Sequence, residues 1–339
     1  MRSSLVGSEM CIRDRVDTVN GFTTGTVTPT SVSEDKADLA TLNGTTGISL
    51  ATTNITVTDA VSLSQAQTIN GYTTGTVTLN SVSDTVSNLA TLAAIDNAEV
   101  TIAGAAISVS DAATLANANT INAYTTGQVT LTSVSDTVAN ITSIDGLTTS
   151  EVTMAGATVS ITDAGVTKAQ LDTVNGFTTG TVTALTVTED KADLATLNGT
   201  TGISLATTNI TVTDAVSLSQ AQTINGYTTG TVTLNSVSDT VSNLATLAAI
   251  DNAEVTIAGA AISVSDAATL ANANTINAYT TGQVTLTSVS DTVANITSID
   301  GLTTTEVTMA GATVSITDTG ASKAQVDTCL LYTSPSPRD

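Results

Sequence analysis

An acidic residue closes a β-like run at nearly constant intervals along the chain, and this period constrains the fold more than any other feature. The intervals are 24 to 27 residues long, and each such segment is called a coil below. A fixed period of this length is typical of solenoids, in which each segment is too small to bury its own apolar face and is covered by its neighbours. The acidic column consists of Asp35, Asp59, Asp84, Asp111, Asp136, Asp163, Asp190, Asp214, Asp239, Asp266, Asp291 and Asp318.

A longer repeat contains the coils. Residues 17–171 (copy 1) recur as residues 172–326 (copy 2) with an offset of 155 and nine differences, such as Pro29 against Ala184. Such close identity indicates either a recent duplication or the misassembly of a longer array.

The two ends of the chain do not share this period. Residues 5–14 can be back-translated into a DNA strand whose reverse complement, read in another frame, encodes the C-terminal tail from Cys329 to Arg338. The shared DNA resembles a transposon adapter used for sequencing libraries. We therefore predict that residues 1–15 and 329–339 are adapter-derived and do not continue the coils. Residues 16–328 are then expected to be a fragment of a longer gene product.

Each coil divides into a strand, a short helix and a turn. Period-two alternation in Thr76–Leu79 and in Ile107–Ser110 predicts strands, and the longer coils insert a turn between two strands, as in residues 100–107. The apolar residues at 86, 89, 92 and 95 follow with the spacing of one helical face. The helical stretches end at pairs such as Asn70-Gly71, which suit a left-handed residue.

These patterns predict an α/β solenoid of about twelve coils over residues 16–328, β-rich, with a parallel sheet along one side and one short helix per coil. An all-β solenoid, in which the helical stretches are only corners, is the alternative. A string of sandwich domains fits poorly, because about 26 residues cannot close a sandwich.

Composition excludes several classes of function. Residues 16–328 contain neither His nor Cys, which excludes Ser-His-Asp and Cys-His nucleophiles and His/Cys zinc sites within them. Four lysines stand against 27 acidic residues there, a net charge of −23, which argues against a nucleic-acid partner. No apolar run approaches the ~18 residues of a membrane-spanning helix.

The acidic column supports two interpretations. In the first, each Asp is the N-cap of the helix that follows it, because its carboxylate accepts the free N–H groups of the first turn. In the second, the carboxylates form a ladder that binds Ca²⁺, which prefers clustered oxygen ligands. One carboxylate per coil is an incomplete ligand shell, and only Glu34-Asp35 and Glu189-Asp190 place two acids side by side at a column position.

Two further columns have a structural and a functional interpretation each. Six aromatic rings each lie shortly after the Asn of an Asn-Gly or Asn-Ala turn, either to cap the core or to form a platform for sugar rings. Thr-X-Thr pairs either reflect β-propensity on a solvated face or resemble the ordered-water surface of ice-binding proteins, although Gln128 and Glu151 interrupt them. The rings are Phe22, Tyr72, Tyr124, Phe177, Tyr227 and Tyr279, and the pairs begin at Thr26, Thr56 and Thr76 and at their copy-2 equivalents.

Runs such as Ile55–Leu63 and Ile107–Leu115 resemble the Thr/Val/Asp-rich tandem repeats of very large bacterial surface and secreted proteins of the adhesin-like or haemolysin-like kind. The likeness covers nearly all of residues 16–328. The glycine-rich nonapeptide of the calcium-binding haemolysins is absent, so their calcium sites are not carried over.

This resemblance implies an extracellular or cell-surface, non-enzymatic array that acts as a spacer or stalk. The alternative is a solenoid that binds calcium, a glycan or ice directly. The expected partners are cell-surface or glycan ligands and the neighbouring repeats of the same chain, with no nucleic acid.

Overall fold

The computed structural model describes residues 12–95, 99–147, 151–250, 254–302 and 306–327. Strands and helices alternate along the chain, so the protein is α/β, and the stretches after the strands are helices and not corners of an all-β coil. The helices are α1 (Ile12–Asn20), α2 (Lys36–Gly44), α3 (Leu63–Asn70), α4 (Val86–Ile95), α5 (Leu115–Asn122), α6 (Val138–Asp145), α7 (Lys168–Asn175), α8 (Lys191–Gly199), α9 (Leu218–Asn225), α10 (Val241–Ile250), α11 (Leu270–Asn277) and α12 (Val293–Asp300).

The long strands occupy the positions that alternation predicts, and the longer coils contain the expected second, short strand. The strands are β1 (Ser31–Glu34), β2 (Asn54–Val61), β3 (Val77–Asp84), β4 (Val100–Thr101), β5 (Ala106–Ala113), β6 (Val129–Asp136), β7 (Val152–Thr153), β8 (Thr158–Ile161), β9 (Val182–Ala184), β10 (Thr186–Glu189), β11 (Ile203–Ser204), β12 (Asn209–Val216), β13 (Val232–Asp239), β14 (Val255–Thr256), β15 (Ala261–Ala268), β16 (Val284–Asp291), β17 (Val307–Thr308) and β18 (Thr313–Ile316).

The chain divides into two compact units, Met1–Ser160 with Gly176–Thr181, and Ile161–Asn175 with Val182–Asp339. In the first unit the strand order is β1-β2-β3-β5-β6-β8, with β4 beside β3 and β7 beside β6. In the second it is β10-β12-β13-β15-β16-β17, with β14 beside β13 and β18 beside β16. The registered pairs are parallel, as in Val32↔Ile55 and Ile55↔Val77. Each coil therefore hydrogen-bonds to the coil before it and the coil after it.

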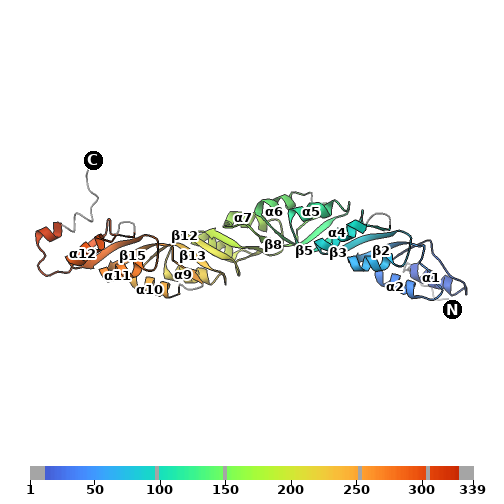
Figure 1. Cartoon of the computed structure of the whole chain (residues 1–339), viewed down its shortest axis with the longest axis horizontal. Coiled ribbons are helices and arrows are strands. Elements are labelled where there is room, and N and C mark those ends of the chain that lie inside the picture. Colours follow the sequence, from blue (N-terminus) through green and yellow to red (C-terminus); the bar gives the residue numbers. More distant parts are fainter. Residues whose placement is uncertain (1–11, 96–98, 148–150, 251–253, 303–305, 328–339) are drawn as a thin grey trace, which may run out of the picture. The chain divides into compact units, whose positions relative to one another are not determined.

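The core lies between the strands and the helices, which follow one another along one side of the strands within each unit (Figure 1). Each strand turns alternate residues inward, and a typical helix adds two, such as Leu89 and Leu92 of α4 at 0 % and 1 % exposure. Helices of 8 to 10 residues are marginal alone in water, so this burial is what keeps them folded. The buried core is built almost entirely from Val, Ile, Leu and Ala, and the described aromatic rings are not part of it.

The prediction of a left-handed residue at the helix ends is wrong for the Asn-Gly, Asp-Gly and Asn-Ala turns after α3, α6 and α5. Gly71 has φ −66° and Gly146 has φ −74°, and Ala123 stands at the same place after α5 with φ −72°. The last turn tightens instead, since the Tyr72 N–H donates to the Ile69 carbonyl three residues back. An alanine fits this position as well as a glycine because the backbone stays right-handed.

Residues 12–15 form the first turn of α1, so the expectation that residues 1–15 leave the coil order is wrong for these four. Arg13 takes the place that Lys168 has in α7, and Val16, only 8 % exposed, takes the place of the buried Leu171. The predicted adapter residues 1–11 and 329–339 lie outside the described residues.

Candidate functional site

The acidic column lies at the edge where the strands lead into the helices, but most of its members do not cap their own helix. Asp35 is the N-cap of α2, with its carboxylate accepting the Asp38 N–H at 2.8 Å, and Asp190 caps α8 in the same way. In the other helices whose N-caps are defined, a Ser or Thr takes this role, as Ser62 does for α3 and Thr137 for α6. The prediction of own-helix N-caps is therefore confirmed at Asp35 and Asp190 and is wrong for the coils in which Ser or Thr caps the helix.

The carboxylates instead cap the helix of the preceding coil. Among the described residues, eleven carboxylates each accept a backbone N–H at the start of a helix that lies 21 to 25 residues earlier in the chain, at distances of 2.6 to 3.0 Å. The donor is the first residue of the helix, except in α1, where it is Arg13, the second residue. The pairs are Arg13–Glu34, Lys36–Asp59, Leu63–Asp84, Val86–Asp111, Leu115–Asp136, Lys168–Glu189, Lys191–Asp214, Leu218–Asp239, Val241–Asp266, Leu270–Asp291 and Val293–Asp318. We call this set the inter-coil cap.

In α3, two donors of the helix start are thus satisfied by two different coils. The Ser62 side chain accepts the N–H of Gln65, the third residue of α3, whereas Asp84 from the next coil accepts the N–H of Leu63, the first residue. A helix N-terminus carries four N–H groups without an intrahelical partner and a partial positive charge, so a carboxylate is the preferred acceptor there. The acidic column therefore joins coils that are neighbours in space.

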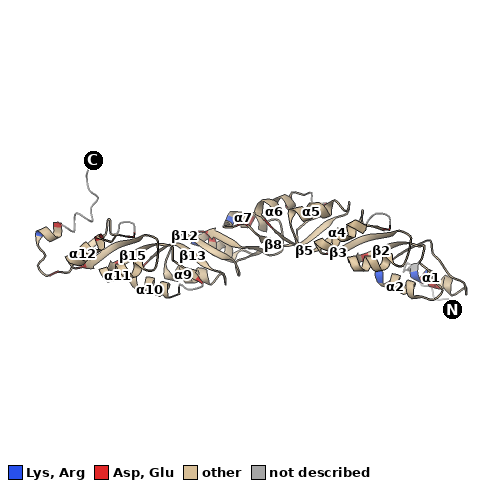
Figure 2. Ribbon diagram, in the orientation of Figure 1, with Lys and Arg blue, Asp and Glu red and all other residues tan. Residues whose placement is uncertain are grey.

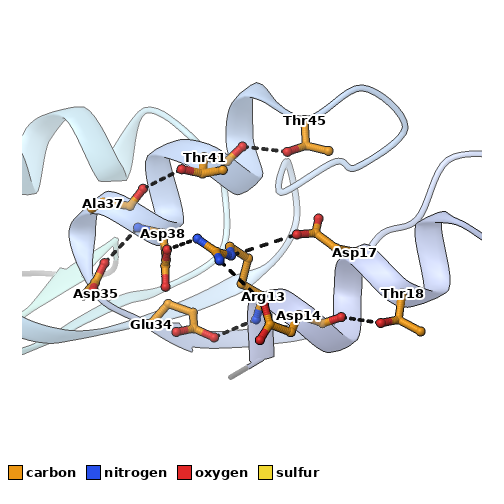
Figure 3. Close-up of polar contacts among 10 residues, drawn as sticks. All are labelled: Arg13, Asp14, Asp17, Thr18, Glu34, Asp35, Ala37, Asp38, Thr41 and Thr45. Carbon is orange, nitrogen blue, oxygen red and sulfur yellow. Dashed lines mark hydrogen bonds and ion pairs between the residues drawn. The ribbon is translucent and has the colours of Figure 1, made fainter. Parts of the chain in front are cut away.

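Glu34 and Glu189, rather than Asp35 and Asp190, hold the inter-coil position in their coils. Figure 3 shows both roles together: the Arg13 N–H donates to Glu34, and Asp35 caps its own helix through Asp38. Glu34 is 8 % exposed, and its extra methylene lets it reach the preceding helix from one residue earlier in the chain. The adjacency of Glu and Asp was visible in the sequence, but nothing in it assigned the two roles.

Four of the twelve members of the column lie at a break in the strand pairing. Asp59 and Asp111 lie where the register shifts, between Val57 and Ala60 and between Val109 and Ala112. Asp214 and Asp266 repeat this geometry in the second unit. A bulge of this kind re-aims side chains, here towards the preceding helix, and it accommodates the longer coil spacing.

Four further members, Asp84, Asp136, Asp239 and Asp291, are the last residues of their strands and accept additional hydrogen bonds. Asp84 accepts from the N–H of Leu63 at 2.8 Å, the N–H of Thr85 at 2.9 Å and the Nδ2 of Asn88 at 2.8 Å. Partial burial acts to raise the pKa of Asp84, but these hydrogen bonds outweigh it and hold the pKa below the ordinary 3.8. The same causes lower the pKa of Asp136, Asp239 and Asp291.

Basic residues are few along the ribbon (Figure 2), and one of them reinforces the inter-coil cap in each copy. Lys36, at the start of α2, forms an ion pair with Asp59 at 2.8 Å and donates to the Ala60 carbonyl at 2.7 Å. Lys191 pairs with Asp214 at 2.7 Å. Burial acts to raise the pKa of Asp59, but the hydrogen bonds and charge of Lys36 lower it overall. The ammonium group thus links α2 to the strand of the next coil.

The Thr-Thr-Gly motif makes a second connection between coils. The Thr73 hydroxyl donates to the Thr53 carbonyl at 2.6 Å and accepts the Gly75 N–H at 2.8 Å. The backbone N–H and the hydroxyl of Thr74 both donate to the Ala51 carbonyl at 2.9 Å. The first threonine of the motif binds the preceding coil in the same way at Thr125–Ala105, Thr178–Ala157, Thr228–Thr208 and Thr280–Ala260.

The glycine of this motif is required by the close approach of two backbones. A Cβ added to Gly75 or Gly230 would lie 2.5 Å from the carbonyl oxygen of Thr53 or Thr208, a distance that real Cβ atoms do not show. The φ angle is not the reason, since the positive-φ glycines of the chain are others, such as Gly47 and Gly202. In the sequence the motif served only to mark the period, so this role was missed.

The aromatic rings sit at the surface between successive helices. Tyr72 lines a groove of about 280 Å³ with Lys36, Gln65 and Ile69, and Tyr124 lines one of about 400 Å³ with alanines of α4. The rings are half-buried, except for Phe22, which is 80 % exposed. They cover the helix junctions without entering the core, and the sugar platform stays a prediction.

Threonines of neighbouring strands line up across the sheet, but they form a single row and not a row of Thr-X-Thr pairs. Thr56 is in register with Thr78, and Thr78 with Thr101. The second threonine of the first pair, Thr58, falls in the bulge between the registered positions and has no such neighbour in β3. The ice-binding interpretation, which needs both members of each pair on successive coils, stays a prediction.

The described carboxylates are spread along the coil edge. No group of three or more His, Cys, Asp or Glu side chains within residues 12–95, 99–147, 151–250, 254–302 and 306–327 gathers to hold a metal ion. The calcium ladder is not tested by this geometry and stays a prediction. Within the same ranges, no helix has the length and apolarity needed to cross a bilayer.

Similarity to known proteins adds nothing to this geometry. No family model, curated protein or solved structure matches the chain. The inter-coil cap and the Thr-Thr-Gly connection are the recurring features of the described coils.

Proposed function

We propose that residues 16–328 are a non-enzymatic structural array, a solenoid that acts as a spacer or stalk in a surface or secreted protein. The observation that carries this proposal is the use made of the recurring polar side chains. The acid, the two threonines and the glycine that recur through the array bind or contact the neighbouring coil. Residues repeated in this way serve cohesion between coils, whereas a catalytic site is needed only once.

The energetics favour a linear, cooperative stack. A hydrogen bond to a charged group contributes about 1.5–3 kcal/mol. Eleven inter-coil caps connect the described coils. Connections limited to adjacent coils make stability a sum of local and nearest-neighbour terms. Such an array extends by adding coils and needs no other part of the protein, which is what a spacer requires.

The surface charge supports placement outside the cell. Residues 16–328 carry a net charge of −23, and a charge of this size favours solubility and disfavours association between separate molecules. An array that presents few cations also has little attraction for anionic polymers.

Small-angle X-ray scattering on residues 16–328 tests the proposal. A stalk gives a radius of gyration well above the ~20 Å of a compact globule of this length. A value near 20 Å would overturn the solenoid. Detection of turnover or of tight binding to a soluble glycan by the same residues would overturn the spacer role while leaving the solenoid in place.

A further inference from the structure

The last described coil exposes apolar residues whose equivalents in copy 1 are buried. Val326 is 37 % exposed, whereas Leu171, which is 155 residues earlier, is 0 % exposed. Val159 and Ile161 are at 1 % and 0 %, while their equivalents Val314 and Ile316 are half-buried. We call Val314, Ile316, Ala321 and Val326 the end face.

The equivalent of the end face shows what covers such a surface. Inside the second unit, the segment around Val166 is covered by β10 of the next coil. The Val166 N–H donates to the Thr186 carbonyl at 3.0 Å, and the Gly165 N–H donates to the Thr186 hydroxyl at 2.5 Å. Glu189 supplies the inter-coil cap to Lys168 at 2.6 Å. The segment that covers this surface is thus the beginning of copy 2.

The beginning of copy 1 carries a matching hollow. Val19, Val27, Pro29 and Ser31 line a groove of about 440 Å³ together with Arg15 and Val16. Arg15 and Val16 precede the repeat, and Val16 holds the place that Val326 has at the other end, so we call only the first four residues the start face. Val19 is 50 % exposed, whereas its equivalent Val174 is 0 % exposed. Phe22 is 80 % exposed and its equivalent Phe177 is half-buried. Both ends of the array therefore expose apolar groups that the interior junction covers.

The differences between the two copies concentrate on these same surfaces. Eight of the nine lie at residues 29–33 and 164–171 and their equivalents, and the structure brings the two segments together at the junction of the copies. The hydrogen-bonding groups are kept: Ser31 replaces Thr186, and Gly320, with φ 81°, replaces Gly165, with φ 68°. The end face is smaller than its equivalent, with Ala321 for Val166 and Val326 for Leu171. The two segments that differ between the copies are thus the equivalents of the two that meet at residues 164–171 and 184–188.

We propose that the end face is a docking surface whose partner is the start face of another copy of the same 155-residue repeat, in head-to-tail order. In that contact Ser31 accepts the Gly320 N–H, Glu34 caps the helix that begins at Lys323, and β18 gains a parallel neighbour on its open edge. The proposal concerns the two ends and holds whether or not the array acts as a spacer.

The test is a longer chain in which residues 327–339 are replaced by a second copy of residues 17–145. Hydrogen exchange of the peptide 313–326 is measured by mass spectrometry. Its sequence differs from that of 158–171, so the buried equivalent is read in the same sample. Docking is expected to slow exchange across 313–326 at least about tenfold relative to the parent chain, towards the rate of 158–171.

The matched control carries Gly25→Val in the appended copy only. Gly180, the equivalent of Gly25, lies against the Ala157 carbonyl, so the added side chain would collide with the Ala312 carbonyl and abolish the protection. Unchanged exchange across 313–326 would overturn the proposal, and so would equal slowing by an unrelated folded domain appended at the same point. A shorter extension by residues 17–70 carries the same readout if the longer chain does not fold.

Discussion

The close approach at the Thr-Thr-Gly motif predicts that one methyl group added there separates two coils. The substitution is Gly75→Ala together with Gly230→Ala, so that both copies change alike. Gly75 does not have a positive φ angle, so the obstacle to alanine is contact: the added Cβ would lie 2.5 Å from the Thr53 carbonyl oxygen and 2.9 Å from the Asn54 Oδ1. The coils must move apart by roughly 0.5–1 Å to restore an ordinary contact.

The expected loss of unfolding free energy at each site is the sum of two contributions. Overpacking of a tight contact costs about 1–3 kcal/mol. The displacement also weakens the hydrogen bond from the Thr73 hydroxyl to the Thr53 carbonyl, which is worth about 1 kcal/mol. We therefore expect each site to lose about 2–4 kcal/mol of local unfolding free energy, the sum of these terms.

Thermal unfolding followed by circular dichroism is the assay, with Gly71→Ala and Gly226→Ala as the control. Gly71 has φ −66°, and Ala123 occupies the equivalent position, so alanine there should be neutral or stabilising by up to about 1 kcal/mol. The Gly75 variant should melt lower by about 2–4 °C per kcal/mol. Equal melting temperatures for the two variants would refute the argument from backbone contact.

The remaining predictions concern the acidic column. The folded-state pKa of Asp84 and its three equivalents is lowered, so their stabilisation is complete above pH 3.8 and is lost as the pH falls through the lower folded-state value. The melting temperature should therefore drop between pH 5 and pH 2, and a flat profile would contradict the inter-coil cap. Asp84→Ala removes an acceptor of three hydrogen bonds and should cost about 2–3 kcal/mol in urea unfolding, against about 1 kcal/mol for the own-helix cap variant Ser62→Ala. A smaller loss for Asp84→Ala than for Ser62→Ala would contradict the inter-coil assignment. Sodium chloride should raise the melting temperature because it screens the net charge of −23, and a larger rise with millimolar Ca²⁺ at equal ionic strength would identify the column as a cation ladder as well. If calcium never exceeds the effect of ionic strength, the column is capping alone.

Local patterns in the sequence were sufficient to locate the strands and helices. Alternation placed β3 and β5, and the i, i+3 spacing of Val86, Leu89, Leu92 and Ile95 placed α4. These elements depend on which side chains are apolar along a few consecutive residues, and that information is local. The period of 24–27 residues likewise predicted that neighbouring segments cover one another.

The role of the polar residues was decided only by the stacking of coils. Capping rules describe contacts within a helix's own first turn, so they assigned Asp84 to α4, whereas its carboxylate reaches Leu63 in the coil before. The need for Gly75 was also hidden, because the opposing atom belongs to Thr53, 22 residues away in the chain. Both contacts depend on the register and separation of two coils packed against each other, which no window of the sequence contains.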